Sequence, residues 1–308
     1  MARRLVLLLT SIVPLLAIAA PAHALTIGIA DQKPEMFADP RFGLSGISHA
    51  RISVGWDVMT SPWQVAELDQ WMNAARAAGV APLVSFGHSR TARRSLPTHE
   101  RFLYEFRRFR ARYPWVTDYA TWNEANHCGE PTCHRPALVA AYYRKLRREC
   151  PSCRILAAEL LDMPNMVTWV KQFRRASRVV PRLWGLHNYL DANRFRTSGT
   201  TRLLQATKGQ IWLTEVGGIV ARRNRRKVGF PESTRHAAEA VSWVFDKLLP
   251  LSSRLTRVYV YHWNTDSRTE NWDSALIGPG GHVRPAFGVL TRELTLLAAR
   301  KAAKAKRK

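Results

Sequence analysis

Two glutamates stand out in this chain of 308 residues because each ends an otherwise apolar run. Glu124 lies in "DYATWNEANH", residues 118–127, and Glu215 lies in "GQIWLTEVGG", residues 209–218. Glutamate is depleted in strands, so an apolar run that finishes on one indicates a carboxylate held where a strand ends. Two facing carboxylates suit glycoside hydrolysis, in which one is a protonated acid and the other an ionised nucleophile or base.

Both glutamates belong to an alternation of strands and helices that begins at Leu25. Strands that are apolar throughout suit a parallel sheet buried on both faces. Eight of them, separated by helical patterns, predict an α/β fold, a single (β/α)8 TIM barrel over residues 25–298. A doubly wound open sheet is the alternative, but no glycine-rich phosphate turn follows the first strand. The expected strands are residues 25–32, 50–57, 80–87, 116–126, 154–162, 183–191, 209–218 and 257–264.

The active site of such a barrel lies at the C-terminal ends of its strands, where the polar and aromatic candidates of this chain gather. The fourth and seventh strands lie across the barrel from each other, so Glu124 and Glu215 are expected to face each other. A separation near 5 Å between the carboxyl groups would imply retention of configuration, and a wider gap inversion. Further candidates at strand ends are Trp56, Asp57, His88, Asn123, Glu159, Asp162, His187, Asn188, Tyr189, His262, Trp263 and Asn264.

The sequence around both glutamates resembles that of a known group of enzymes. "WNEAN", residues 122–126, resembles the W-N-E-P-N motif of glycoside hydrolase clan A, the retaining barrel glycosidases that include cellulase-like and xylosidase-like families. "WLTEVG", residues 212–217, is similar to the seventh-strand nucleophile motif of the clan. The resemblance implies that Glu124 is the general acid/base, that Glu215 is the nucleophile, and that Asn123 binds the sugar 2-hydroxyl. Ala125 replaces the common proline.

The resemblance also implies substrate-binding roles for other residues. His187 and Tyr189 in "HNY" are similar to a histidine and a tyrosine on the sixth strand, where the tyrosine orients the nucleophile. Trp263 matches a tryptophan that forms a platform for the sugar ring, although a core role competes, and Arg51 matches an arginine on the second strand. From their positions at strand ends we expect the pocket to be lined by Trp56, Asp57, His88 and Trp122.

The two glutamates are expected to differ in pKa. Apolar neighbours such as Trp122 and the charge on Glu215 should raise the pKa of Glu124 and hold it protonated, while Glu215 stays ionised. Glu159 and Asp162 are more simply explained as structural residues. The chemistry needs no cofactor and no metal.

The N-terminus has the layout of a secretory signal. Residues 1–24 contain two arginines, an uncharged apolar run, and the small-x-small pattern Ala22-His23-Ala24. A membrane anchor is the alternative, but Pro14 and the short run argue against it. We therefore expect a secreted, extracellular protein without a membrane span in the mature chain.

Four cysteines form two close pairs, Cys128 with Cys133 and Cys150 with Cys153. A helix expected over residues 135–149 would be about 20 Å long and would separate the pairs, so all four cannot bind one zinc ion. In an oxidising compartment two local disulfides are the better interpretation.

The formal net charge is +24, with 47 lysines and arginines against 23 acidic residues. A bias toward arginine on solvent-exposed helix faces, together with a basic disordered tail at residues 299–308, is the simpler explanation. The alternative explanation is affinity for an anionic cell-envelope polymer or membrane surface. Nucleic acid is not expected, because no recognised motif accompanies the charge.

Three functional hypotheses follow from these observations. The first is a secreted retaining glycoside hydrolase that cleaves a poly- or oligosaccharide by double displacement. The second is a carbohydrate-binding pseudoenzyme on the same scaffold, and the third is an envelope protein that binds anionic polymers through its arginines. The paired glutamates favour the first.

Overall fold

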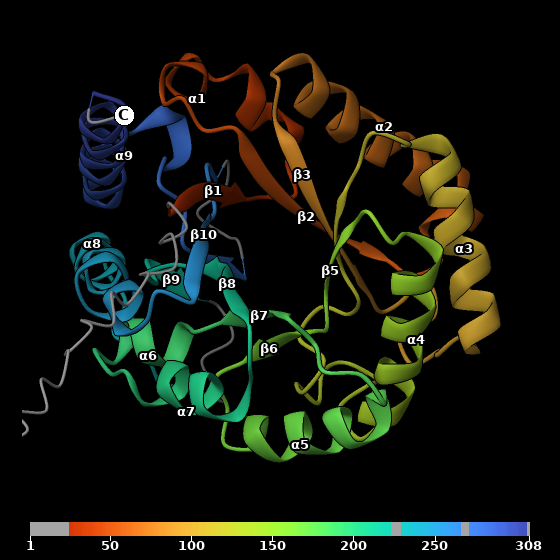
Figure 1. The fold of residues 1–308 in the computed structure, drawn as a ribbon. Helices are drawn as coiled ribbons and strands as arrows, with labels where there is room; N and C mark the ends of the chain where they lie inside the picture. Colours follow the sequence, from red (N-terminus) through yellow and green to blue (C-terminus); the bar gives the residue numbers. More distant parts are fainter. Residues whose placement is uncertain (1–24, 223–228, 266–270, 307–308) are drawn as a thin grey trace, which may run out of the picture.

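The computed structural model describes residues 25–222, 229–265 and 271–306. These residues form a barrel of parallel strands within a ring of helices (Figure 1), which confirms the expected TIM-barrel fold. The candidate signal segment, residues 1–24, lies outside the described residues. No described helix is long and apolar enough to cross a membrane.

The barrel strands are hydrogen-bonded in the order β5-β4-β3-β2-β1-β10-β8-β7-β6, and every pairing is parallel. Their bounds are β1 (Thr26–Ala30), β2 (His49–Gly55), β3 (Ala81–Gly87), β4 (Asp118–Ala120), β5 (Arg154–Leu156), β6 (Glu159–Leu161), β7 (Leu183–His187), β8 (Gln210–Val216) and β10 (Leu255–Tyr261). The fifth expected strand is divided into β5 and β6 by two alanines. Backbone bonds at this break, from Ala157 N to Leu183 O and from Glu159 N to Trp122 O, close the ring.

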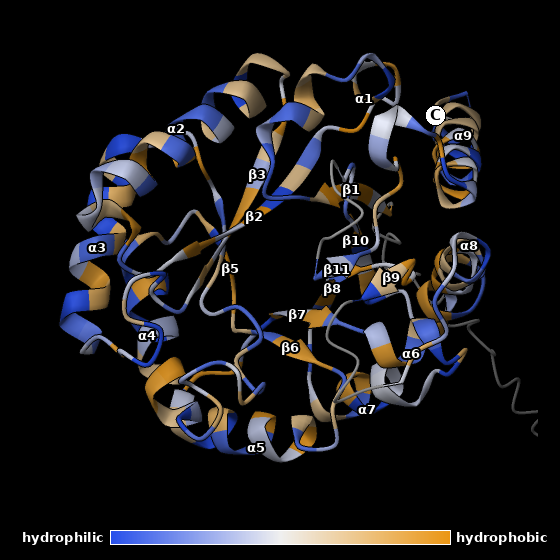
Figure 2. Ribbon diagram, turned by 180° about the vertical axis from the view of Figure 1, so that it is seen from behind, coloured by the Kyte–Doolittle hydropathy of each residue, from blue (hydrophilic) through white to orange (hydrophobic). Residues whose placement is uncertain are grey.

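The helices pack around this sheet with their hydrophilic sides outward, as Figure 2 shows. They are α1 (Pro40–Leu44), α2 (Pro62–Ala77), α3 (His99–Arg112), α4 (Pro136–Glu149), α5 (Met166–Ser177), α6 (Tyr189–Asn193), α7 (Ser198–Ala206), α8 (Thr234–Trp243) and α9 (Pro285–Ala305). Short 3-10 turns at Pro34–Ala38, Val58–Thr60, Leu249–Leu251 and Pro279–Gly281, and a π turn at Val244–Leu248, complete the helical elements.

Helix α3 shows how local sequence sets these elements. The Thr98 hydroxyl accepts a hydrogen bond from Arg101 N at 3.1 Å, so it satisfies one of the free backbone donors of the first turn. Glu100 lies in that first turn, and Arg110 and Arg112 lie in the last turn. Charges in these positions complement the helix dipole. The helix ends just before Pro114, which cannot continue it.

The barrel interior is filled below the strand ends. A small apolar cluster contains Leu83, Leu156, Trp212 and Tyr259 among its buried residues. Beneath it the Arg257 guanidinium donates to Asp118 at 2.8 Å and lies 3.8 Å from the Trp212 ring centroid. The larger apolar core lies between the strands and the helices. Side chains therefore fill the interior of the barrel at this level.

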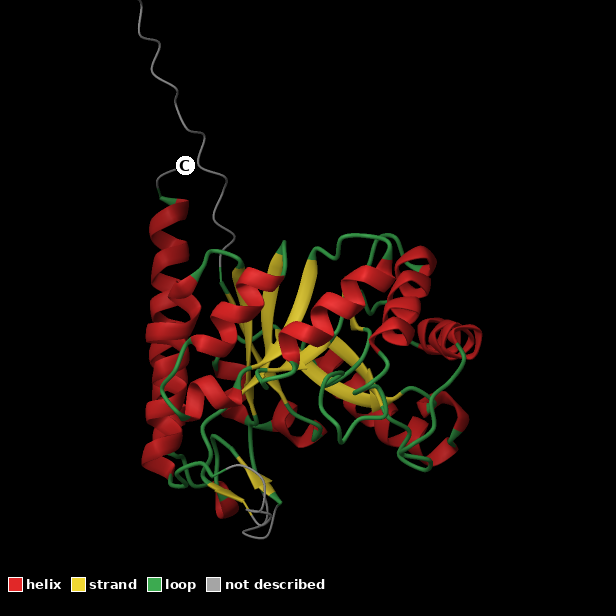
Figure 3. Cartoon of the chain, turned by 90° about the horizontal axis from the view of Figure 1, so that it is seen from below, coloured by secondary structure: helices red, strands yellow, loops and turns green. Residues whose placement is uncertain are grey.

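Two features of the chain were not expected from its sequence. A second sheet pairs β9 (Ala221–Arg222) with β11 (Trp272–Asp273), and Figure 3 shows it at the end of the barrel opposite the C-terminus. The expected disordered tail at residues 299–308 is also wrong over its first part, because α9 continues to Ala305. Alanine and lysine are good helix formers, and no proline or glycine interrupts "AARKAAKA".

Candidate active site

Arg51 lies at the centre of the strand-end cluster and is almost fully buried. Its guanidinium donates to both carboxylate oxygens of Glu159, at 2.8 and 2.7 Å. It also donates to Glu215 Oε2 at 2.8 Å and to Asn123 Oδ1 at 2.7 Å. One cation from β2 therefore fixes three side chains: Asn123 after β4, Glu159 at the start of β6 and Glu215 near the end of β8.

Glu215 keeps some exposure, with 17 % of its side chain accessible. Its Oε2 accepts from Arg51, and its Oε1 accepts from the Tyr189 hydroxyl at 2.9 Å. Tyr189 lies two residues after the end of β7 and is the first residue of α6. Both oxygens thus have a donor, so the carboxylate is held in a single orientation toward the barrel axis.

Glu124 lies in the turn after β4, where its φ of 44° places the backbone in the left-handed region. Such a conformation is uncommon for a residue with a side chain and is often found at functional sites. His187 Nδ1 lies 3.2 Å from Glu124 Oε1, and His127 Nδ1 lies 3.5 Å from Glu124 Oε2. A carboxylate oxygen of Glu124 lies within 4.8 Å of one of Glu215. The two carboxylates therefore face each other closely, as predicted.

The charges in this cluster shift one another's pKa values. Burial lowers the pKa of His187, but the carboxylates of Glu215, Glu124 and Glu159 outweigh burial and raise it to about 9. Burial raises the pKa of Glu159, and the charge and hydrogen bonds of Arg51 outweigh it and lower that pKa well below its usual range. At neutral pH the site therefore holds two cations, Arg51 and His187, among its carboxylates.

The expected pKa of Glu124 is wrong for the free protein. Burial raises this pKa, but the hydrogen bond from His187 and the charges of His187 and His127 outweigh burial and lower it. Trp122, expected as the apolar neighbour of Glu124, is fully buried in the core between strands and helices. Its ring stacks on Tyr142, at 5.7 Å between ring centroids, and its Nε1 donates to Glu130. Trp122 and Glu124 both lie beyond the end of β4, so the alternation of a strand does not set the directions of their side chains.

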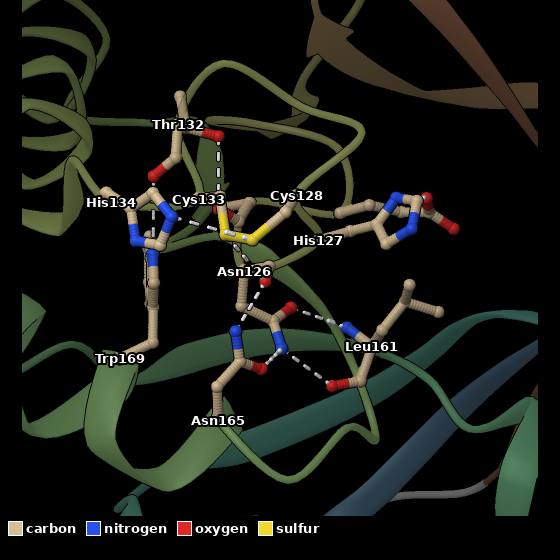
Figure 4. Close-up of a disulfide and its surroundings, with 11 residues drawn as sticks. Asn126, His127, Cys128, Thr132, Cys133, His134, Leu161, Asn165 and Trp169 are labelled. Carbon is tan, nitrogen blue, oxygen red and sulfur yellow. Dashed lines mark hydrogen bonds and ion pairs between the residues drawn. A yellow bond between two sulfur atoms is a disulfide. The ribbon is translucent and has the colours of Figure 1, made fainter. Parts of the chain in front are cut away.

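The turn that carries Glu124 is anchored on both sides by Asn126 (Figure 4). The Asn126 amide donates to Leu161 O at 3.0 Å and accepts from Leu161 N at 2.8 Å, so it pairs with the end of β6. Asn165 Nδ2 donates to Asn126 O at 2.8 Å. Just beyond, a disulfide joins Cys128 and Cys133. A second disulfide joins Cys150 and Cys153 at the far end of α4, so both expected pairings are confirmed.

His88 lies beside this turn, with 26 % of its side chain exposed. Its Nδ1 is 2.5 Å from Glu130 Oε1, and Glu130 Oε2 accepts from Trp122 Nε1 at 2.9 Å. Glu130 is buried and lies within the loop closed by the Cys128–Cys133 disulfide. Sequence reasoning missed Glu130, although an acidic residue between two paired cysteines was a visible signal.

The proposed sugar platform at Trp263 is wrong. Its side chain is fully buried, its Nε1 donates to Asp39 Oδ2 at 3.0 Å, and its ring packs edge-on against Phe42 and Phe287. Strand β10 ends at Tyr261, so the chain has left the barrel interior before Trp263. Trp56 is likewise only 9 % exposed and belongs to the core between strands and helices. It is not a pocket liner.

Two other aromatic residues lie near the candidate site. Tyr261 follows Tyr259 by two residues on β10, so both side chains lie on the same face of the strand. Tyr261 packs against the interior cluster and is half-buried. Trp272, in the added sheet, is also half-buried, and its ring meets the Tyr189 ring edge-on at 5.0 Å between centroids. Sequence reasoning missed both, because Tyr261 lies within an apolar strand and β11, which carries Trp272, has two residues and no periodicity of its own.

The cluster of Glu124, His187 and Glu215 has a spacing that could also hold a metal ion. A ligating histidine has to be neutral, so a metal ion would have to displace the proton that the neighbouring carboxylates stabilise on His187. Arg51 already neutralises Glu215. The second such group contains Cys128 and Cys133, whose sulfurs are joined to each other and are not thiolates. The charges at the strand ends therefore favour acid–base chemistry over metal binding.

Comparison with solved structures places this fold among glycoside hydrolase barrels. The GH5_18 protein of Streptomyces cattleya, solved in complex with Manb1-4GlcNAc, has a TM-score of 0.61 and 14 % identity, over 88 % of this chain and 80 % of that one. A beta-glucosidase from Exiguobacterium marinum has a TM-score of 0.58 and 13 % identity, over 87 % and 86 %. A GH113 beta-1,4-mannanase has a TM-score of 0.53 and 11 % identity, over 89 % and 98 %.

These solved structures share the clan A barrel, which is the fold that the "WNEAN" and "WLTEVG" motifs implied. At identities of 11 to 14 % the likeness concerns the fold. No family model and no curated protein sequence matches the chain. The chemistry therefore has to be inferred from the side chains at the strand ends.

Proposed function

We propose that this protein is a retaining glycoside hydrolase, with Glu215 as nucleophile and Glu124 as general acid/base. The observation that carries the proposal is the approach of their carboxylate oxygens to within 4.8 Å of each other. Retaining enzymes hold their carboxyl groups about 5–5.5 Å apart, whereas inverting enzymes leave a gap of about 6.5–9.5 Å for a water molecule. The spacing in this site supports the first arrangement.

The reaction has two displacements. In the first, a Glu215 oxygen forms a bond to the anomeric carbon, the glycosidic bond breaks, and the leaving oxygen takes a proton from Glu124. In the second, water attacks the anomeric carbon and gives a proton to Glu124, and the Glu215 carboxylate is released. Tyr189 and Arg51 hold Glu215 at 2.9 and 2.8 Å, so its attacking oxygen is oriented before the sugar arrives.

The proton that Glu124 delivers is held at rest by the Glu124–His187 pair. His187 is protonated at neutral pH, and its Nδ1 lies 3.2 Å from the Glu124 carboxylate. A sugar that excludes water from Glu124 raises its pKa, because desolvation disfavours the charged form. Transfer from His187 to Glu124 then creates the neutral acid required for the first step. This accounts for a catalytic acid whose pKa is lowered in the free protein.

Asn123 is suited to bind the sugar beside the nucleophile. Its Oδ1 accepts from Arg51 at 2.7 Å, which assigns the orientation of the amide and leaves Nδ2 as the donor available to a ligand. An amide donor next to Glu215 fits a hydrogen bond to the 2-hydroxyl, and such bonds strengthen in the transition state.

The substrate class that we propose is a β-linked oligo- or polysaccharide. The names of two structural neighbours, a beta-glucosidase and a beta-1,4-mannanase, concern β-linked glycosides, and a third neighbour was solved with Manb1-4GlcNAc. Tyr261 and Trp272, half-buried near the site, supply the aromatic surface on which sugar rings pack.

We also propose that the protein is exported. The layout of residues 1–24 and the two disulfides support an oxidising destination outside the cytoplasm.

The test is a screen of aryl β-glycosides, including mannosides, glucosides and N-acetylglucosaminides, together with β-mannan and β-glucan. Proton NMR of the first product formed reads its anomeric configuration. We expect a β-configured product, and turnover reduced at least about a hundredfold in Glu124→Gln with substrates whose leaving group needs protonation. Inverted product would overturn the retaining mechanism, and absence of turnover across the screen would overturn the activity.

A further inference from the structure

Helix α5 and the residue that follows it carry a row of four cations. Lys171, Arg174 and Arg175 follow the spacing i, i+3 and i+4, which places them on one side of the helix, and Arg178 comes directly after its last residue. All four are exposed. At 1.5 Å per residue the row extends about 10 Å along the helix axis.

A second cationic row lies on the neighbouring helix α4, next to α5 in the ring (Figure 1). It consists of Arg144, Arg147 and Arg148, at the spacing i, i+3 and i+4. Arg144 Nη1 donates to Ala176 O at 2.6 Å, so this row reaches the end of α5. Burial, and after it the charges of Arg178 and Arg148, lower the pKa of Arg144.

The surface beside the α5 row is hollowed. A groove of about 510 Å³ is lined by the four α5 cations together with Val179 and Val180. Arg178 itself has a φ of 56°, so the chain turns away sharply at the end of the helix. The cations therefore border a concave surface, into which a ligand can settle.

Helix stabilisation accounts for only part of this charge. Cations in a last turn complement the helix dipole, and Arg174 and Arg175 lie in the last turn of α5. Lys171 lies outside that turn, and Arg178 lies beyond the helix. Within the part of the chain that the structure describes, no carboxylate lies within 4.0 Å of a charged nitrogen of these seven side chains. From residue 136 to 182 the acidic residues are Glu149, paired with Arg107, and the buried Glu159 and Asp162.

The groove is remote from the candidate active site. Helix α5 runs antiparallel to the strands, so its last turn lies near Leu183 at the start of β7, whereas His187 ends that strand. The five residues of β7 correspond to about 17 Å. A ligand bound along α5 would leave Glu124 and Glu215 accessible.

We propose that the groove beside the α5 cations, together with the neighbouring cationic row of α4, binds a linear polymer that carries phosphate groups. The rows run along the helix axes, which fits an extended chain with regularly repeated negative charges. An arginine guanidinium can bind two phosphate oxygens at once, and six of the seven cations are arginines. The site is independent of the proposed glycosidase activity. It would hold the protein on an anionic polymer while the active site hydrolyses its substrate.

A membrane surface fits the groove less well. Amphipathic segments that bind bilayers insert Trp, Phe or Leu. The exposed apolar residues at this groove are only Val179 and Val180, at 41 and 51 % exposure.

The test measures binding of fluorescently labelled inorganic polyphosphate by anisotropy at low and high salt. Three proteins are compared: the unaltered chain, the triple variant Lys171→Gln/Arg175→Gln/Arg178→Gln, and a control triple variant Arg94→Gln/Arg235→Gln/Lys247→Gln. The control removes the same charge from exposed sites elsewhere. Titration with vesicles of phosphatidylglycerol forms a second arm.

We expect the unaltered chain to bind polyphosphate, with binding that weakens as salt rises. The α5 triple variant should lose about tenfold in affinity, and the control less than about threefold. Equal losses in the two variants, no binding at low salt, or binding to vesicles alone would each overturn the proposal. Hydrolysis of a small aryl glycoside should be unchanged in the α5 variant, and the anisotropy does not depend on turnover, so the two proposals fail separately.

Discussion

Arg51 and Glu159 form a buried ion pair that supports the rest of the site. The side chains are 2 and 0 % exposed, and the pair is bidentate. Removing one member of such a pair leaves an uncompensated charge, whereas replacing both with apolar residues removes the charge altogether. Stability and activity should therefore respond differently to single and double substitution.

We predict that Arg51→Met lowers the free energy of unfolding by about 3–5 kcal/mol, because the Glu159 carboxylate is left buried without its partner. The double variant Arg51→Met/Glu159→Met should recover most of this loss. Activity should remain low in both, since Glu215 and Asn123 lose their donor. Urea denaturation measures the stability. A single variant that loses less than about 1 kcal/mol would contradict a buried pair.

The raised pKa of His187 predicts a pH-dependent stability. Its folded-state value of about 9 exceeds the ordinary 6.5, so its contribution is fully present below pH 6.5 and is lost as the pH rises through 9. We expect the melting temperature of the unaltered chain to exceed that of His187→Gln most at about pH 6, and the difference to shrink by about pH 10. A difference that is constant across this range would show that His187 is neutral throughout.

At this scale the sequence predicted both glutamates and their partners, because motifs at strand ends specify them. It could not predict the pKa of Glu124, which depends on His187, 63 positions away, and on a backbone turn with positive φ. Trp263 was misplaced for a related reason. The motif suggested its role, but the side-chain direction depends on where β10 ends.

At the scale of elements, the turn after β4 is the segment on which the site depends most. The sequence suggested a strand over residues 116–126, whereas β4 covers only Asp118–Ala120. The remainder turns back on itself and is held by Asn126, by Glu130 and by the Cys128–Cys133 disulfide. Hydrophobic pattern alone does not distinguish the end of a strand from an apolar turn.

The two disulfides offer a matched comparison of this turn with a remote one. Cys128→Ser/Cys133→Ser should lower kcat/KM about tenfold or more, because it loosens the loop that carries His127 and Glu130 beside Glu124. Cys150→Ser/Cys153→Ser, at the opposite end of α4, should leave kcat/KM within about twofold. Each double variant should lose about 2 kcal/mol of stability, since both bridges close short loops.

Kinetics on an aryl glycoside and urea denaturation of both double variants separate the two effects. Equal losses of activity would show that the Cys128–Cys133 bridge only stabilises the fold.

At the scale of the whole molecule, the barrel could be predicted because eight apolar strands alternate with amphipathic helices, and few folds satisfy that pattern. The β9–β11 sheet could not, because its strands of two residues are 50 positions apart and have no periodicity of their own. The distribution of charge could not be predicted from composition either. It became apparent only from the structure, which places the cations of α4 beside those of α5.

The central claim is that Glu215 is the nucleophile and Glu124 the general acid/base. Azide rescue tests this claim most directly. With an activated aryl β-glycoside, Glu215→Ala should lose at least about a thousandfold in kcat, and sodium azide should restore part of it with an α-glycosyl azide as product. Glu124→Ala should instead give the β-glycosyl azide, because its nucleophile is intact. Full activity in Glu215→Ala, or exchanged azide configurations, would contradict the assignment.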